Sequence, residues 1–289
     1  MQISRLVLAT MCALTLTAPA FAQNPNRRSP RRPRNPTKTA TAGRTALPVR
    51  AVLASWLDDA DTLDPGRVGI GLSVGRWSAL DGGESDAPAV DVSIGIVRGL
   101  QLSASLPYYR AAYSDGFRSS GLGDSYFVAK VRLIDPHTHR VGVSISPTLE
   151  VLSQNAVSDT TLGLSRANVA LPISIEIDRD QFRAYGTAGY FSRGAVTVGG
   201  ALERALTPRV TVLGTVSYSH TTHPPRTSDL VDLSPFRTDA AGGLQVMLTP
   251  AITVSGSLGR TISRLDQNGA RLTATAAISI LTGRSKPVP

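Results

Sequence analysis

The chain has 289 residues, is 42% hydrophobic and 18% charged, and carries a formal net charge of +9. Its single cysteine lies at position 12, which excludes a disulfide scaffold or a thiolate metal site in the rest of the chain. No stretch approaches 18 consecutive apolar residues, so helical membrane spans are also excluded.

Residues 1–22 have the features of a signal peptide. Arg5 supplies the positive charge, residues 6–16 form a short apolar run, and Ala20-Phe21-Ala22 is a small-residue cleavage site. The apolar run is too short for a permanent span, which needs about 20 residues. We therefore expect an exported protein that begins near Gln23.

Residues 23–50 form a basic, proline-rich tail. Eight Lys and Arg residues and no acidic residue lie between Asn24 and Arg50, so nearly all of the net charge belongs to this tail. It has few large apolar side chains with which to offset its ordering entropy, and we expect it to be disordered. Because an exported protein rarely meets nucleic acid, we expect the tail to contact anionic lipid head groups or cell-wall carboxylates instead.

A short lead-in segment, residues 51–66, precedes a long region of strands. Ala51 to Leu63 is expected to form a short helix or turn, which Pro65-Gly66 then breaks. From residue 67 on, apolar and polar residues alternate with the period of two that is typical of strands, as in VDVSIGI at residues 90–96. We expect twelve strands, at residues 67–77, 89–98, 100–111, 122–134, 140–152, 164–177, 182–192, 195–206, 210–221, 237–248, 251–263 and 270–281.

The connections between these strands indicate a membrane barrel. Those after even-numbered strands are mostly tight, whereas several after odd-numbered strands are long and polar, namely residues 78–88, 112–121, 153–161 and 222–235. Short turns at one rim and longer loops at the other are typical of outer-membrane barrels. We therefore predict an all-β fold, a closed antiparallel up-and-down transmembrane β-barrel over residues 67–283 with a C-terminal tail at 284–289. A soluble exported β-sandwich is the alternative.

In such a barrel, one face of each strand contacts lipid and the other faces the lumen. In SYFVAKVRLI, residues 125–134, Phe127 and Leu133 share one face, whereas Lys130 and Arg132 share the other. In a membrane barrel the apolar face meets lipid, and the charged face lines an aqueous lumen whose mixed charges can tune selectivity. The candidate lumen-lining residues are Asp91, Lys130, Arg132, Glu150, Glu176, Arg183 and Glu203.

Other polar motifs do not point to catalysis or to a metal site. The histidines of HTH (residues 137–139) and HTTH (residues 220–223) lack a third ligand nearby, so we interpret them as turn residues. Ser217, Ser219 and His220 lie near a loop, but the sequence pattern of outer-membrane phospholipase A is missing around them. GLGD at residues 121–124 lacks the continuation of a phosphate-binding loop. We expect no enzymatic activity, no catalytic or metal site, and no cofactor.

Three stretches together resemble the outer-membrane transporter family of the MetA pathway of phenol degradation. They are DADTLDPGRVGIGLSVG (residues 59–75), VSIGIVRGLQLSASLPYYR (residues 92–110) and GLGDSYFVAKVRL (residues 121–133). The family pattern is a Pro-Gly entry to the first strand, a hairpin that ends in Leu-Pro-Tyr, and Gly-x-Gly-Asp at the start of the next strand. The resemblance implies a channel that passes small, often hydrophobic or aromatic compounds across the bacterial outer membrane, and it implies no catalytic residues.

Three hypotheses for function follow. The first is a passive channel in the outer membrane, whose partners are outer-membrane lipid and a small-molecule solute. The second is a structural or adhesive barrel that does not transport, with the loop at residues 222–235 outside and the basic tail inside. The third is a soluble exported β protein.

Overall fold

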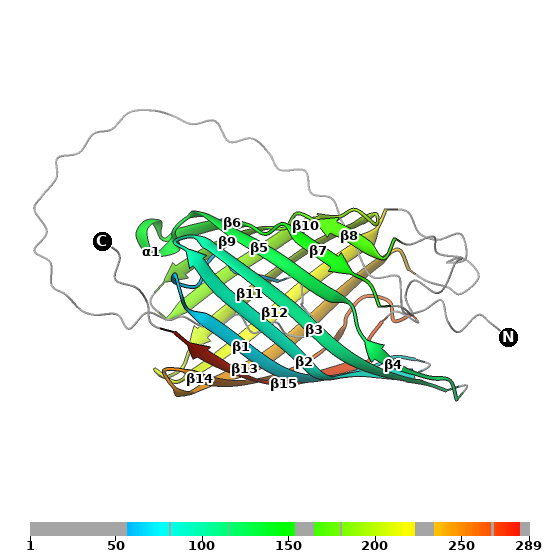
Figure 1. Cartoon of the computed structure of the whole chain (residues 1–289). Coiled ribbons are helices and arrows are strands. Elements are labelled where there is room, and N and C mark those ends of the chain that lie inside the picture. Colours follow the sequence, from blue (N-terminus) through cyan, green and yellow to red (C-terminus); the bar gives the residue numbers. More distant parts are fainter. Residues whose placement is uncertain are drawn as a thin grey trace, which may run out of the picture.

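The computed structural model describes residues 57–80, 82–114, 116–153, 165–179, 181–222, 234–266 and 269–283. They form fifteen strand segments and one short helix, α1 (Pro136–His139). The strand segments are β1 (Val68–Ser78), β2 (Gly82–Val97), β3 (Leu100–Tyr113), β4 (Arg118–Leu122), β5 (Ser125–Ile134), β6 (Val141–Ile145), β7 (Thr148–Val151), β8 (Ala167–Ala170), β9 (Ile173–Arg179), β10 (Phe182–Phe191), β11 (Ala195–Ala205), β12 (Val210–Thr221), β13 (Phe236–Thr249), β14 (Ile252–Thr261) and β15 (Leu272–Thr282). Three spanning strands are each interrupted once, as β4 with β5, β6 with β7 and β8 with β9. Twelve strands therefore form the wall (Figure 1).

The sheet closes on itself, which confirms the predicted barrel. β1 pairs antiparallel with β15 along its whole length, from Val68 opposite Thr282 to Ser78 opposite Leu272. Every other spanning strand pairs with its neighbours in the chain. Closure removes the exposed edges that a membrane would not tolerate. Among the described residues, no helix is long and apolar enough to cross a membrane.

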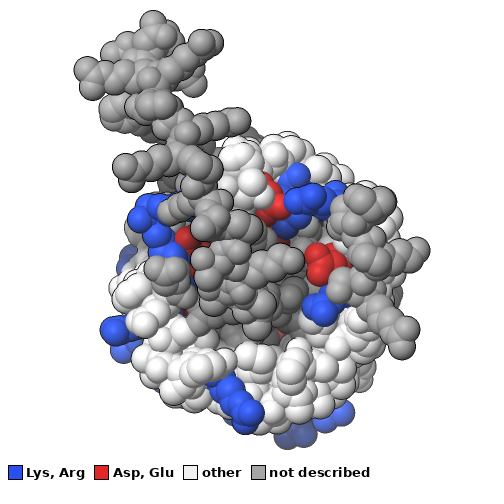
Figure 2. Space-filling view, turned by 90° about the vertical axis from the view of Figure 1, so that its left-hand side faces the viewer, with Lys and Arg blue, Asp and Glu red and all other residues white. Residues whose placement is uncertain are grey.

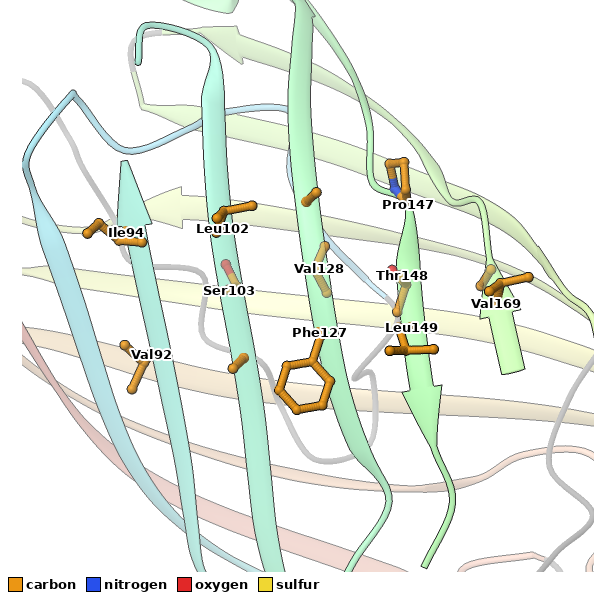
Figure 3. Close-up of a pocket in the computed structure, with 13 residues that line it drawn as sticks. Val92, Ile94, Leu102, Ser103, Phe127, Val128, Pro147, Thr148, Leu149 and Val169 are labelled. Carbon is orange, nitrogen blue, oxygen red and sulfur yellow. The ribbon is translucent and has the colours of Figure 1, made fainter. Parts of the chain in front are cut away.

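Two of the three interrupted strands, β6–β7 and β8–β9, keep backbone groups bonded across their breaks. Pro147 and Pro172 have no N–H to donate, so they end the ladder locally. Their carbonyls still accept hydrogen bonds, from Ala129 N to Pro147 O at 3.0 Å and from Ser146 N to Pro172 O at 2.9 Å. The wall is therefore continuous at β6–β7 and β8–β9. Just outside this region lies an open apolar hollow of about 590 Å³, lined by Val92, Leu102, Phe127 and Leu149 among others (Figure 3).

The faces of the wall are inverted relative to a soluble sheet, as the sequence predicts. On β5, the Phe127 side chain is 44% exposed on the outer face, whereas Lys130 is 2% exposed on the inner face. The large exposed side chains of other strands, such as Leu258 and Ile175, are likewise apolar. Most buried positions of the wall instead hold Ser, Thr, Gln and charged residues, although Tyr109, Val128 and Phe191 are also buried. Such an outer surface suits lipid, and the predicted transmembrane barrel is confirmed over the soluble β-sandwich.

A charge on the outer face should destabilise the barrel. Val216 lies in the middle of β12 and is 52% exposed on that face. We expect Val216→Arg to lower the free energy of unfolding in lipid vesicles by about 2–4 kcal/mol, because the guanidinium must enter hydrocarbon. Urea unfolding followed by the gel mobility of the folded form measures this, with Val216→Leu as control. Equal stability of the two variants would mean that this face does not contact lipid.

Some predicted boundaries were wrong. The sequence places loops at residues 78–88 and 112–121, but β2 begins at Gly82, and β3 continues to Tyr113 in a hairpin with β4. These strands extend the wall at the rim opposite α1. The lead-in holds no helix between residues 57 and 66, although the turn at Pro65-Gly66 is present, with Gly66 at φ 79°. Residues 1–56, 154–164, 223–233 and 284–289 lie outside the described residues, and with them the predicted signal peptide, basic tail and C-terminal tail.

Candidate functional site: the charged lumen

The lumen contains part of the lead-in, residues 57–63, here named the lumenal segment. Its residues belong to no strand, yet most are buried, and Ala60 is 0% exposed. The lead-in enters at the rim that carries α1, where Gly66 N donates to Gly95 O at 2.8 Å. Leu57 reaches Gly199, about halfway along β11. Figure 2 views the barrel from the α1 rim and shows acidic and basic side chains inside the ring of the wall.

Lys130 of β5 is directed at the lumenal segment. Its Nζ donates to Asp58 Oδ1 at 2.7 Å, to Asp59 Oδ1 at 2.9 Å and to the backbone oxygen of Asp61 at 3.1 Å. These three acceptors use all three protons of the ammonium group. A lysine this deeply buried needs such partners, because an unpaired buried charge is costly.

Two arginines hold the remaining carboxylates. Arg183 of β10 donates from Nη2 to Asp59 and from Nε to Glu176 Oε1 at 2.7 Å, and it lies 3.7 Å from Glu203 Oε2. Arg132 of β5 donates to Asp61 Oδ1 at 2.6 Å. The planar guanidinium of Arg183 therefore joins the lumenal segment to two strands of the wall at once.

Side chains of the wall also bond the backbone of the lumenal segment. Thr187 Oγ1 accepts from Asp58 N at 3.0 Å and donates to Asp58 O at 2.7 Å. Ala60 N donates to Glu176 Oε2 at 3.0 Å, and Leu63 N donates to Gln101 Oε1 at 2.9 Å. Buried backbone groups outside strands need partners of this kind. Side chains of the wall thus provide the hydrogen bonds that neighbouring backbone groups would provide in a sheet.

Small residues of the wall leave room for the lumenal segment. A Cβ atom on Gly199 would lie 2.6 Å from Leu57 Cδ2, and one on Gly142 would lie 3.0 Å from Ala60 Cβ. Ser144, beside Gly142, donates to Asp59 O at 3.3 Å. The inner surface of the wall is therefore complementary to this segment in both shape and charge.

Two aspartates of the lumenal segment, Asp59 and Asp61, have lowered pKa values. Burial alone would raise the pKa of Asp59, but Lys130 and Arg183 hold that pKa well below its ordinary value. Burial likewise opposes the lowered pKa of Asp61, which is set by a hydrogen bond with His137 at 3.1 Å. The pKa of His137 is raised, chiefly by its hydrogen bond with Asp61. Lys130, Arg132 and Arg183 face six carboxylates, those of Asp58, Asp59, Asp61, Asp135, Glu176 and Glu203.

These shifts predict how docking of the segment depends on pH. The groups that face His137 are Asp61, Asp135 and Arg132. A raised histidine pKa adds stability that is complete below the ordinary value of 6.5 and is lost as the pH rises through the raised pKa. The lowered pKa of Asp61 adds stability above 3.8 that is lost as the pH falls through the folded value. The segment should therefore be held most tightly between these limits.

The measurement uses a cysteine at Thr62, whose hydroxyl has no hydrogen-bond partner among the described residues. We expect maleimide labelling of Thr62→Cys, relative to a free cysteine peptide, to rise by about two- to fivefold on the alkaline side. His137→Asn should abolish this rise. A rise that persists in the His137→Asn background would contradict the assignment.

The structure brings five of the seven predicted lumen residues into one network. Lys130, Arg132, Glu176, Arg183 and Glu203 all belong to it. Glu150 is 0% exposed but lies in a separate pair with Arg193, whose Nη2 donates to Glu150 Oε1 at 3.0 Å. Asp91 is half-buried beside Gly71 and makes no contact with the network.

Sequence reasoning missed the residues at the centre of the site. Asp58, Asp59 and Asp61 lie in the lead-in, which was expected to be only a helix or turn. A usable signal was present, because three aspartates within four residues follow Leu57, a short distance beyond the strongly basic tail that ends at Arg50. Gln101 and Thr187 lie on the inner face of regular strands, and nothing in the sequence around them indicates that they bind the lumenal segment.

The other polar motifs are placed apart from each other. His137 bonds Asp61, and His220 lies on β12, far along the chain. The described residues hold no group of three His, Cys, Asp or Glu suited to a metal ion, and His223 lies outside them. On β12, alternation puts Ser217 and Ser219 on the inner face with buried Thr215, whereas His220 falls on the outer face. These residues therefore do not form a Ser-His pair.

Comparison with known proteins agrees with the fold. No model of a known protein family and no curated protein matches the chain. Among solved structures, the NanC porin matches with a TM-score of 0.52 and 13% identity, over 73% of this chain and 98% of that chain. The COG4313 outer membrane channel from Pseudomonas putida F1 matches with a TM-score of 0.55 and 12% identity, over 78% and 100% of the two chains. The chain therefore has the β-barrel fold of this porin and this outer membrane channel.

Proposed function

We propose that this protein is a channel for the passive passage of small solutes across the outer membrane. The observation that carries the proposal is the closed twelve-stranded wall, apolar outside and charged inside. Twelve strands lie between small barrels filled by side chains and large open porins, so a narrow path is expected. The wall residues Lys130, Arg132, Arg183, Glu176 and Glu203 would then set the charge of that path.

The solute class rests on a separate argument. Residues 59–75, 92–110 and 121–133 resemble the transporter family of phenol degradation, which extends the proposal to small hydrophobic or aromatic compounds. Uptake into liposomes that contain the refolded protein tests this part. Phenol-sized aromatic compounds should enter faster than sugars of similar mass. Equal rates for both would limit the proposal to general small solutes.

Conductance in planar bilayers tests the channel itself. Refolded protein should show discrete current steps in salt solution, and a deletion strain should take up its solute more slowly. If neither the protein nor variants with an emptied lumen conduct, and deletion leaves uptake unchanged, transport is ruled out.

The second candidate is a structural or adhesive barrel that does not transport. The observation in its favour is the lumenal segment itself, because it occupies the path from the α1 rim to mid-barrel. The basic tail would then act by contact with anionic head groups or cell-wall carboxylates. Under this alternative, deletion of residues 24–50 should change location or assembly, whereas permeability should not change.

A further inference from the structure

The lumenal segment is held as a bound ligand is held. Its three aspartates meet three wall cations, as Asp58 and Asp59 meet Lys130, Asp59 meets Arg183, and Asp61 meets Arg132. The backbone partners Thr187, Glu176 and Gln101 come from β10, β9 and β3. Charge-assisted bonds from several strands toward one short acidic chain are the features of a preformed binding site.

The segment can leave without breaking the wall. The hydrogen bonds cited between the segment and the wall are made by wall side chains, whereas the ladder bonds of the barrel begin at the turn beyond it, where Gly95 N donates to Arg67 O at 3.0 Å. The turn at Asp64 to Arg67, with Gly66 in the left-handed region, is fixed to β2 at the α1 rim by the bond from Gly66 N to Gly95 O, so the segment before this turn would be the part that moves. Withdrawal through that rim would leave every strand pairing intact.

We propose that the lumen holds a binding site for a short acidic chain, that the protein's own Asp58 to Asp61 occupies this site in the closed channel, and that exchange of this segment opens the channel. The proposal rests on the proposed channel function. When the segment leaves, the wall carboxylates that remain beside Lys130, Arg132 and Arg183 are those of Glu176, Glu203 and Asp135. Asp135 is shared between Arg132 and a fourth cation, Arg98, so four positive charges then face three negative ones and the emptied site carries a net positive charge. Its ligand is therefore a peptide or other solute with two or more carboxylates.

The first test neutralises the resident ligand. We expect full-length protein with Asp58→Asn, Asp59→Asn and Asp61→Asn together to spend about tenfold or more additional time open in planar bilayers, because several charge-assisted bonds are lost. The matched control is Asp239→Asn, which removes a buried lumenal carboxylate that pairs with Arg237 and does not touch the segment. The control should behave as the wild type.

The second test refills the site from outside. A synthetic peptide of residues 57–63, LDDADTL, added on the side of the α1 rim should block the current of the triple variant. The same peptide with asparagine in place of the three aspartates should not block at equal concentration. Block by both peptides, or by neither, would overturn the binding site.

The third test fixes the segment in place. A Cβ atom at position 142 would lie 3.0 Å from Ala60 Cβ, which is closer than the separation of about 3.8 Å that is typical of a disulfide. A small shift of the segment away from the wall should therefore allow Ala60→Cys with Gly142→Cys to form a disulfide. The oxidised protein should be closed, and reduction should restore the open events of the wild type. Full wild-type conductance in the oxidised state, with the disulfide verified, would overturn the exchange of the segment and leave the channel function standing. Silence of all variants, the triple variant included, would remove the channel function itself.

Discussion

Replacing Lys130 with methionine should release the lumenal segment from the barrel. Methionine fills a similar volume but leaves the carboxylates of Asp58 and Asp59 buried without the ammonium that bonds both. Removal of one partner from a buried ion pair typically costs about 3–5 kcal/mol. The segment can avoid this cost by moving into water, so we expect maleimide labelling of Thr62→Cys to accelerate by roughly 100-fold or more.

The barrel itself should survive this change. Lys130 lies on the inner face of β5, and its ladder partners on β3 are unaffected by the side chain. Heat-modifiable gel migration should therefore match the wild type. Arg98→Gln is the control, because Arg98 pairs with Asp135 at 3.4 Å on the exposed rim. Unchanged labelling in Lys130→Met would show that the segment does not depend on the lysine.

The barrel wall could be predicted from sequence because its signal is local and repeated. Alternation such as VDVSIGI at residues 90–96 fixes which side chains share a face, and tight turns such as Arg98-Gly99 fix which strands are neighbours. The errors lie at the rim. At residues 82–88, GGESDAP reads as a loop because it is rich in glycine and charge, yet pairing with β1 and β3 draws it into β2.

Only the wall residues of the site could be predicted from the sequence. The wall residues Lys130 and Arg183 stand out as charges on regular strands. Their partners do not, because Asp59 lies 71 residues from Lys130 and 124 from Arg183 along the chain, and the cluster of aspartates in the lead-in does not by itself indicate burial. Ionic pairing between an irregular segment and a wall depends on tertiary structure alone. A charged inward face was therefore predicted to line water where it in fact binds the chain itself.

Replacing Arg183 should release the lumenal segment to an extent similar to that of Lys130→Met. The cause is here the repulsion between carboxylates that have lost their shared cation. Arg183→Met leaves Asp59, Glu176 and Glu203 converging on a site from which their shared cation is missing. Carboxylates that approached one guanidinium lie near one another, and like charges that are buried close together repel strongly. We expect release of the segment, again with roughly 100-fold faster labelling of Thr62→Cys. Adding Glu176→Gln should restore part of the protection, because it removes one of the stranded charges.

The conservative variant separates charge from geometry. Arg183→Lys keeps the positive charge but cannot bond Asp59 and Glu176 through the two arms of a guanidinium. We expect intermediate labelling, faster than the wild type and slower than Arg183→Met. Labelling equal to that of the wild type would mean that charge alone holds the segment. Labelling equal to that of Arg183→Met would mean that the planar fork between the segment and β9 is the essential contact.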